Sequence, residues 1–300
     1  MAKRGRKKQN NVIYSLLVAI TFIILGIIGG KEGINRGNIT TVTNEDLSGD
    51  TIKIYYFDVG QADSILLTSD GKSMLIDAGN NDDGELVVNK IQQLGITRLD
   101  YVIGTHPHED HIGGMDNVIN AFDIGTIYMP KIQNNTKTFE DVLDAISNKG
   151  LNISSPEQGN VFTVGKINCE VMLCGSGTRE EQKSNLNLSS IVIRATYGEQ
   201  SYLFMGDAEE ENENTRNWPK TTVLKVGHHG SNTSTSKEFL EEVCPEVAII
   251  SVGEANKYGH PTEETLNKLN NIKAEIYRTD ERGTITIISD GKNNVINTEK

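Results

Sequence analysis

The sequence predicts an α/β protein, with a body of mixed strands and helices from residue 51 to residue 300 behind one N-terminal transmembrane helix. Three observations indicate this class. Strand-like and helix-like patterns alternate along the body, and no internal repeat or Pro- or Gly-rich linker interrupts them. A separate apolar run without charges lies near the N-terminus. Hydrophobic residues make up 36% of the chain, which is ordinary for a globular body with its own core.

The N-terminal segment has the pattern of a membrane anchor. Residues 1–11 are basic, and the apolar run over residues 12–30 contains no charged side chain. At about 1.5 Å per helical residue, this run just spans a hydrocarbon core of about 30 Å. The basic flank predicts a cytoplasmic tail and a body outside the cytoplasm. A cleaved signal peptide is the alternative, but the length of the run and the lack of an A-x-A-like end favour a single-pass anchor in the cell membrane. Residues 31–50 are expected to form a flexible stalk.

Runs of apolar residues predict the strands and helices of the body. The expected strands are 52–57, 99–104, 161–164, 167–173, 189–196, 201–206, 247–252 and 284–288. The expected helices are 84–94, 115–122, 137–149, 207–217, 236–243 and 262–269. The three cysteines, Cys169, Cys174 and Cys244, have neither a disulfide framework nor metal-site spacing, so we expect them to be small core residues.

The most informative motif is the segment 105–114, which reads T-H-P-H-E-D-H-I-G-G and holds three of the six histidines of the chain. Imidazole and carboxylate groups are the ligands that zinc, manganese and iron prefer. His106 and His108 share a parity on an extended backbone, whereas the adjacent Asp110 and His111 point apart. One loop at the end of a strand can therefore supply two metal positions.

The other candidate ligands also follow strand-like runs. His228 and His229 lie in K-V-G-H-H-G-S, and His260 lies in N-K-Y-G-H-P. Asp207 ends the run S-Y-L-F-M-G-D and can either bridge two cations or cap the helix expected after it. Its place beside other ligands at strand ends favours the bridging role.

These motifs resemble those of the metallo-β-lactamase superfamily. The segments F-D-V-G-Q-A-D, T-H-P-H-E-D-H-I-G-G, F-M-G-D-A-E and K-V-G-H-H-G-S carry the resemblance. With Y-G-H-P and Y-R-T-D-E-R-G-T-I-T-I, they are similar to the soluble hydrolase domain of the ComEC type of DNA-uptake competence protein. The resemblance runs from about residue 51 to about residue 290. It implies a four-layer αββα metallo-β-lactamase sandwich with a metal site at one edge of its two sheets.

The resemblance also implies two divalent metal ions, with zinc expected and manganese as the alternative. The expected ligands are His106, His108 and Asp207 for one ion, and Asp110, His111, Asp207 and one of His228 and His229 for the other. We assign His228 to the metal, although the spacing leaves this pair open. Members of the superfamily usually carry a further ligand His before the Gly-Asp motif, and the segment S-N-L-N-L-S-S-I-V-I-R has none. Asn187 or Ser190 could take its place.

The remaining site residues are assigned by the chemistry of phosphate ester hydrolysis. The expected catalytic residues are Asp110, His229 and His260. The carboxylate would orient the nucleophile, and the imidazoles would donate to a phosphate oxygen or to the leaving group. The expected substrate contacts are Ser231, Asn256 and Tyr258. Asp58 is expected to accept from the free N–H of a ligand His, with an acidic turn residue as the alternative. Asp63 and Asp77, near Gly60 and Gly79, could likewise only shape turns. Four lysines near the histidines could steer phosphate or simply face solvent: Lys220, Lys225, Lys237 and Lys257.

The expected function is that of a membrane-anchored, extracytoplasmic hydrolase of phosphodiester bonds, a nuclease linked to DNA uptake with nucleic acid as its substrate. ComEC proteins carry a many-helix channel, whereas one span is expected here. The alternatives are a cell-surface phosphoesterase on another substrate, such as phosphorylcholine on wall polymers, and a non-catalytic surface binding protein. The net charge of −12 argues mildly against tight binding of duplex DNA, because nonspecific nucleic-acid binders usually carry a basic face.

Overall fold

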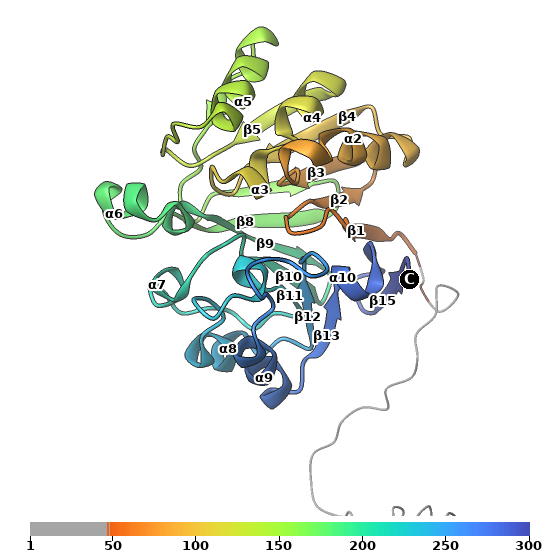
Figure 1. The fold of residues 1–300 in the computed structure, drawn as a ribbon. Coiled ribbons are helices and arrows are strands. Elements are labelled where there is room, and N and C mark those ends of the chain that lie inside the picture. The colour runs from red at the N-terminus through yellow and green to blue at the C-terminus, as the bar shows by residue number, and fades with distance from the viewer. Residues whose placement is uncertain (1–46, 48) are drawn as a thin grey trace, which may run out of the picture. The chain divides into compact units, whose positions relative to one another are not determined.

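Two β-sheets lie face to face in the body, and helices cover the outer face of each sheet (Figure 1). The computed structural model describes residue 47 and residues 49–300. The predicted tail and transmembrane helix, and nearly all of the predicted stalk, lie outside the described residues. Within the described part, no helix has both the length and the apolar character that crossing a membrane requires. The layers follow in the order helix, sheet, sheet, helix, which confirms the expected sandwich.

The first sheet has eight strands, antiparallel on one side and parallel on the other. Its order is β15 (Asn294–Thr298), β14 (Ile285–Ser289), β1 (Ile52–Tyr56), β2 (Ile65–Ser69), β3 (Lys72–Ile76), β4 (Arg98–Ile103), β5 (Asp123–Tyr128) and β6 (Ile153–Ser154). Strands β1 to β3 pair antiparallel, whereas β3 to β6 pair in parallel. Four of the five residues of β3 are buried, because helices cover one face of the sheet and the second sheet covers the other.

The second sheet has seven strands with the same change of direction. Its order is β13 (Glu275–Arg278), β12 (Val247–Ile250), β11 (Val223–Lys225), β10 (Gln200–Phe204), β9 (Ile191–Tyr197), β8 (Ile167–Cys174) and β7 (Val161–Val164). Strands β7 to β10 are antiparallel, and β10 to β13 are parallel. Each sheet therefore has a parallel half whose strands end at a common edge.

The longer helices form the two outer layers. Helices α2 (Gly84–Gln93), α4 (Met115–Ala121) and α5 (Lys137–Asn148) cover the first sheet, and α8 (Lys237–Val243) and α9 (Glu263–Asn271) cover the second (Figure 1). Three of them start behind a hydroxyl that accepts a bond from the first helical turn, at Thr136, Ser236 and Thr262. The shorter segments are α3 (Glu109–Ile112), α6 (Arg179–Ser184), α7 (Glu210–Glu213) and α10 (Thr279–Arg282), and the 3-10 turns η2 (Asn81–Asp83), η3 (Leu186–Ser189) and η4 (Gly227–Gly230).

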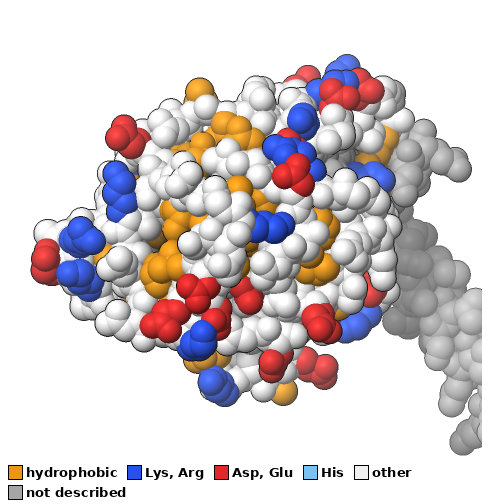
Figure 2. Space-filling view, turned by 90° about the horizontal axis from the view of Figure 1, so that it is seen from above, with side chains coloured by type: hydrophobic (Ala, Val, Ile, Leu, Met, Phe, Trp, Pro, Cys, Tyr) orange, Lys and Arg blue, Asp and Glu red, His pale blue; other side chains and the backbone are white. Residues whose placement is uncertain are grey.

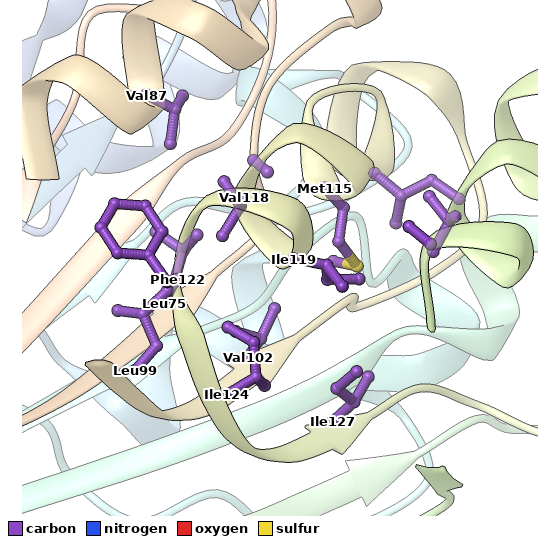
Figure 3. Packing of buried hydrophobic residues seen from close by; sticks show 14 of the residues in the cluster. Leu75, Val87, Leu99, Val102, Met115, Val118, Ile119, Phe122, Ile124 and Ile127 are labelled. Carbon is purple, nitrogen blue, oxygen red and sulfur yellow. The ribbon is translucent and has the colours of Figure 1, made fainter. Parts of the chain in front are cut away.

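Three hydrophobic clusters fill the three spaces between the layers. In the first, Val118 and Ile119 of α4 pack with Val102 of β4 beneath the helices (Figure 3). The second lies between the sheets and includes Met74 of β3. The third joins the second sheet to α8 and α9 and includes Trp218. Burying one such side chain contributes roughly 1.5–3 kcal/mol, so these clusters hold the sheets and helices in one rigid arrangement.

Most expected elements are confirmed, with ends that move by one or two residues. The strand expected over 189–196 begins at Ile191, because η3 takes the preceding residues. The helix expected over 207–217 shrinks to the four residues of α7. Glu209, not Asp207, caps α7, and the buried indole of Trp218 donates to Glu213 O, so tertiary bonds replace the expected helical turns.

Other expectations for the body are corrected or extended. The expected strand ranges omit β2, β3, β5, β6, β13 and β15, and β11 is indicated only by the strand-like run before His228. No cysteine forms a disulfide, and Cys169 is buried as expected, but Cys244 is exposed after α8 in a left-handed conformation that ends the helix.

The two sheets are joined at the edge where their parallel strands end. Ile191 N, at the start of β9, donates to Thr105 O behind β4 at 2.9 Å. Gly206 follows β10 with φ at +54°, and a Cβ there would lie 3.0 Å from the side chain of Thr105. Glycine therefore lets the ends of β4 and β10 approach closely, which brings the segments after them together.

Gly113 should be essential for the packing of this edge. A Cβ at Gly113 would lie 2.2 Å from backbone atoms of Asn80 and Asn81. We expect Gly113→Ala to lower the free energy of unfolding by about 3 kcal/mol, because a backbone cannot move aside as a side chain can. Gly71→Ala is the matched control, since its φ is +71° but nothing lies near its Cβ. Left-handed strain alone should cost that variant about 1 kcal/mol. Urea unfolding compares the two, and equal losses would contradict the packing argument.

Candidate metal centre

All six histidines of the chain gather at the joined edge of the sheets. Their rings form a continuous series of contacts, with centroid distances of 4.7 Å for His106 and His108, 4.2 Å for His106 and His111, and 5.3 Å for His111 and His229. The series continues from His229 to His228 at 6.3 Å and from His228 to His260 at 5.6 Å. Segments that lie far apart in the sequence thus supply one cluster.

The first group of possible ligands consists of His106, His108 and Asp207. His106 Nε2 and His108 Nδ1 lie 2.9 Å apart, and His106 Nε2 lies 3.9 Å from Asp207 Oδ2. The two histidines follow β4 on an extended backbone, and the carboxylate follows β10. These are the residues expected for the first metal position.

The second group consists of Asp110, His111, Asp207 and His229. Asp207 Oδ1 lies 3.2 Å from His111 Nε2 and 3.6 Å from His229 Nε2. Asp110 Oδ2 lies 3.4 Å from His229 Nε2. Asp207 thus faces both groups, one with each oxygen, as the bridging interpretation expects.

Three buried atoms of the second group have no hydrogen-bond partner within the described residues: His111 Nε2, Asp207 Oδ1 and His229 Nε2. They face one another at the distances given above. A buried polar atom without a partner costs about 1–3 kcal/mol, and one cation between the three would satisfy them together. The residues present therefore fit a divalent metal ion.

The structure reverses the expected roles of the two adjacent histidines. His229 is buried within the second group, whereas His228 belongs to neither ligand group. Both residues have left-handed backbones, with φ of +48° for His228 and +52° for His229. This tight turn sends the neighbouring rings in different directions. His228 Nδ1 lies 3.2 Å from Glu209 Oε1 and 3.1 Å from Thr233 Oγ1.

Asp77 and Asp63, rather than Asp58, face the candidate ligand rings. Asp77 Oδ2 lies 2.7 Å from His111 Nδ1, and Asp63 Oδ1 lies 3.4 Å from His229 Nδ1. Both carboxylates are buried, so of the roles left open for them the structure favours support of the ligand rings over the shaping of turns alone. Asp58 instead accepts from Gly60 N and pairs with Lys300 Nζ at 3.4 Å, which matches its turn alternative. Each oriented ring keeps its Nε2 directed toward Asp207.

Lys225 is another correction. A place in a phosphate-steering rim was one expectation for this side chain, but it is fully buried and lies 2.7 Å from Asp63 Oδ2. An alternation of buried and exposed residues along β11 would have predicted the burial of Lys225, but the strand has none, because all three of its residues are buried. Of the four lysines, Lys257 lines the cavity described below.

A polar network includes Asn185 and Asn187, which belong to the segment in which the resemblance implies a further ligand His. Glu209 accepts from Asn185 Nδ2 at 2.5 Å, from Asn187 Nδ2 at 3.2 Å and from Thr233 Oγ1 at 2.8 Å. Burial raises the pKa of Glu209, but hydrogen bonds from His228 and from these three side chains outweigh burial and lower it to about 2. Asn187 Nδ2 also approaches His228 Nδ1 at 3.4 Å. Asn187 is one of the two residues that could replace the missing ligand His. In the structure it contacts His228, which lies beside the ligand groups.

A cavity of about 600 Å³ opens onto the candidate ligands. Its lining includes Asp110, His228, His229 and the loop residues 256–258 and 260. The ring of Tyr258 is 57% exposed and stacks on His260 at 5.8 Å, with Lys257 Nζ 5.0 Å from its centroid.

Two of the expected substrate contacts, Asn256 and Ser231, instead form hydrogen bonds within the protein. Asn256 lines the cavity, but its amide donates to Gly253 O and His260 O and so shapes the loop. Ser231 is buried, and its hydroxyl bonds Thr233 instead of facing the cavity.

The charges of the centre shift the pKa values of its groups. Burial raises the pKa of Asp207, but His111, His229 and His228 outweigh burial and hold it well below its usual value. Burial lowers the pKa of His111, but Asp207 and Asp77 raise it well above the usual value. Carboxylates that favour a proton on His111 also favour a metal ion in its place. Burial holds the pKa of His106 well below its usual value and lowers that of His260 to about 4, so both are neutral near pH 7.

Comparison with known proteins supports the expected resemblance. Residues 57–254 match the family model described as the Metallo-beta-lactamase superfamily. The chain is 34% identical over 195 residues to ComE operon protein 3 of Bacillus subtilis and 30% identical over 258 residues to Recombination protein 2 of Haemophilus influenzae. It is 29% identical over 243 residues to Competence protein ComA of Neisseria gonorrhoeae. The matches cover 64%, 83% and 76% of this chain but only 25%, 30% and 31% of those proteins. They confirm the resemblance to competence proteins, of which the chain spans about a quarter to a third.

Solved structures share the fold at low sequence identity. The metallo-beta-lactamase fold protein YhfI from Bacillus subtilis superposes with a TM-score of 0.55 at 12% identity, over 80% of this chain and 100% of YhfI. CmlA, a diiron β-hydroxylase from Streptomyces venezuelae, superposes with a TM-score of 0.51 at 12% identity, over 80% of this chain and 54% of CmlA. Such a likeness shows the architecture alone, because one fold supports several chemistries.

His229→Ala and His228→Ala should have different effects on metal content. We expect His229→Ala to bind one metal equivalent fewer than the wild type, because His229 completes the second ligand group. His228→Ala leaves both ligand groups intact and should keep both equivalents. Plasma mass spectrometry after dialysis against zinc measures the content. Loss of an equivalent in His228→Ala alone would restore the assignment expected from the sequence.

Proposed function

The chain belongs to the metallo-β-lactamase superfamily as a metal-dependent hydrolase, and we propose that it cleaves the phosphodiester bonds of nucleic acid. The observation that carries this proposal is the composition of the cavity at the candidate metal centre. It combines the ligand groups with a lysine, an exposed tyrosine and a histidine of one loop, residues 257, 258 and 260. A nucleotide phosphate needs nearby cations, and its base needs a flat aromatic face.

The relatives support the same substrate class. Two of them are named a recombination protein and a competence protein, and both names refer to processes of DNA. Since this chain covers only a part of each relative, the DNA-linked function of this chain is our proposal. We propose a role in DNA uptake or in the degradation of external DNA.

The metal content is also part of the proposal. We propose two divalent ions, zinc with manganese as the alternative, held by the two ligand groups around Asp207. When bound, they would supply Lewis acidity to polarise the phosphoryl group. Four buried or largely buried carboxylates and one buried lysine surround the positions: Asp63, Asp77, Asp110, Asp207 and Lys225. Glu209 beside His228 is a fifth buried carboxylate, and a protonated His228, proposed below, would offset it. Two dications with Lys225 would then leave one excess positive charge, which favours an anionic substrate.

The chain's own groups position the substrate. His228 presents Nε2 to the cavity, 3.7 Å from Asp207 Oδ2, while Glu209 and Thr233 hold its Nδ1. Burial lowers the pKa of His228, but Asp207 and Glu209 raise it above its usual value. We propose that the ring carries both protons, so that Nδ1–H donates to Glu209 while Nε2–H donates to a phosphate oxygen. Asp110, held beside His229, would orient the attacking nucleophile. His260, stacked under Tyr258, would donate to the leaving group as a neutral imidazole.

In this proposal, nucleic acid is attracted at the cavity and not by a broad basic surface. On the face drawn in Figure 2, acidic and basic side chains are interspersed, and no broad basic surface forms there. An acidic protein can still hold a nucleic acid strand where cations and an aromatic ring concentrate at one cavity. This arrangement favours single strands or ends over a long duplex.

The location of the chain remains a proposal from its sequence. We propose that residues 12–30 anchor the protein in the cell membrane as a single span and that the hydrolase body lies outside the cytoplasm. External nucleic acid would then reach the cavity directly.

Metal-dependent nuclease activity is the first expectation. The full-length protein in detergent, loaded with zinc or manganese, should cleave labelled single-stranded DNA and bis-p-nitrophenyl phosphate. Asp110→Ala should lose at least about 100-fold in kcat/KM on both, because it removes a ligand and the orienting carboxylate. Cleavage of the small diester alone would favour a phosphoesterase acting on wall polymers. Bound metal without any turnover would favour a non-catalytic binding protein.

Tyr258 offers a test of the nucleic acid substrate. We expect Tyr258→Ala to lower kcat/KM on single-stranded DNA by about 10- to 100-fold, because stacking on one base contributes about 1–3 kcal/mol. Tyr258→Phe keeps the ring and should retain most activity. Neither variant should change cleavage of bis-p-nitrophenyl phosphate by more than about twofold. An equal loss on both substrates in Tyr258→Ala would show that the ring supports the loop rather than a base.

A further inference from the structure

A lysine and an aspartate form a buried ion pair behind the candidate metal centre. Lys225 is 0% exposed and Asp63 is 1% exposed, and Lys225 Nζ lies 2.7 Å from Asp63 Oδ2. The same ammonium donates to Val226 O at 2.9 Å. Neither side chain lines the cavity, so neither can touch a substrate there. Burying two charges is costly, and such a pair often contributes little to stability compared with apolar residues.

The second oxygen of Asp63 faces a candidate metal ligand. Asp63 Oδ1 lies 3.4 Å from His229 Nδ1, and Ser251 O lies 3.0 Å from the same nitrogen. Because a carbonyl oxygen can only accept, the bond to Ser251 O requires the ring proton to be on Nδ1. Asp63 Oδ1 has no hydrogen-bond partner among the described residues, so its negative charge at 3.4 Å favours that proton electrostatically. Nε2 is then left with a free lone pair, and it points toward Asp110 and Asp207 at 3.4 and 3.6 Å.

Comparison with Asp77 indicates what Lys225 contributes. The carboxylate of Asp77 is held by Thr105 N and Thr105 Oγ1, each at 2.8 Å, while it receives His111 Nδ1. Thr105 thus fixes the carboxylate of Asp77 by donating to it. The ammonium of Lys225 fixes the carboxylate of Asp63 in the same way. The ammonium also supplies a cation where Asp63, Asp77 and His111 come close enough to form a third possible metal group. It therefore disfavours metal binding at that wrong position.

We infer that the Asp63–Lys225 pair is a positioning device for His229: Lys225 fixes and neutralises Asp63, and Asp63 with Ser251 O directs His229 Nε2 to the second metal position. Both residues act through His229, so they are positioning residues and not catalytic ones. The inference rests on the metal centre of the proposed function, but it does not depend on the substrate.

The test separates positioning from simple structural support. The full-length protein is compared with Asp63→Asn, Lys225→Met and the double variant Asp63→Asn/Lys225→Met by calorimetric zinc titration and thermal unfolding. Asp100→Asn is the matched control, because Asp100 also pairs with a lysine, Lys72, at 3.0 Å but lies outside the ligand groups. The control should bind zinc as the wild type does.

Each single variant leaves one buried charge unpaired, so we expect its thermal midpoint to fall by about 10 °C. The double variant removes both charges and should recover most of that loss. Its affinity for the second zinc equivalent should nevertheless stay about 10- to 100-fold below the wild type, as in Asp63→Asn, because His229 has lost its carboxylate. A double variant that binds both equivalents with wild-type affinity would overturn the inference. Unchanged or higher affinity in Lys225→Met would overturn the part given to Lys225.

A measurement on the unaltered protein covers the case in which the variants do not fold. Nitrogen-15 NMR of the zinc-loaded wild type should show His229 protonated at Nδ1 with zinc on Nε2. Zinc on Nδ1 would overturn the inference, since neither Asp63 nor Ser251 O could then accept a proton from that atom. A wild type that binds two zinc ions and cleaves no diester would end the proposed function and leave this inference standing.

Discussion

The candidate centre depends on one buried carboxylate, that of Asp207. It is 1% exposed, and its two oxygens face both ligand groups, from His106 at 3.9 Å to His111 at 3.2 Å. A buried anion needs compensation by cations or hydrogen bonds. Here the compensating groups come from loops behind β4 and β11 as well as from the strand end that carries Asp207. Bringing these loops together requires the edges of both sheets to meet, and the close approach of Thr105 to Gly206 allows it.

The packed layers hold the strand ends in place, and this rigidity lets the centre keep a strained backbone. Three hydrophobic clusters lock the strands, so the loops at their ends start from fixed positions. Consecutive left-handed backbones at His228 and His229 cost roughly 1–2 kcal/mol each. Hydrogen bonds hold the turn in place, because Ser231 N donates to His228 O and Ser234 Oγ donates to Gly227 O, both at 2.8 Å. Strain of this kind is typical of sites where a side chain must point in one particular direction.

The fold and the site carry different parts of the functional argument. The architecture is shared with a diiron hydroxylase as well as with metallo-beta-lactamase fold proteins, so architecture alone does not select a reaction. The phosphodiesterase proposal comes instead from the buried ligand groups, the excess positive charge they would have with two metal ions, and the aromatic and basic loop at the cavity. The buried Asp63–Lys225 pair lies behind the centre and connects the ring of His229 to a charge on the second sheet.

The sequence by itself determined the α/β class, most strands and helices, and the identity of the segments that build the centre. These features are local: hydrophobic periodicity reports burial along one segment, and T-H-P-H-E-D-H carries its ligands within one loop. Tertiary structure decided the choice of His229 over His228, the use of Asp77 and Asp63 in place of Asp58, and the burial of Lys225. Each of these depends on backbone direction or on a partner far away in the chain, as with Asp63 in the loop before β2 and Lys225 on β11 of the second sheet. Spacing along a sequence carries no information about such directions, because only the packed layers set them.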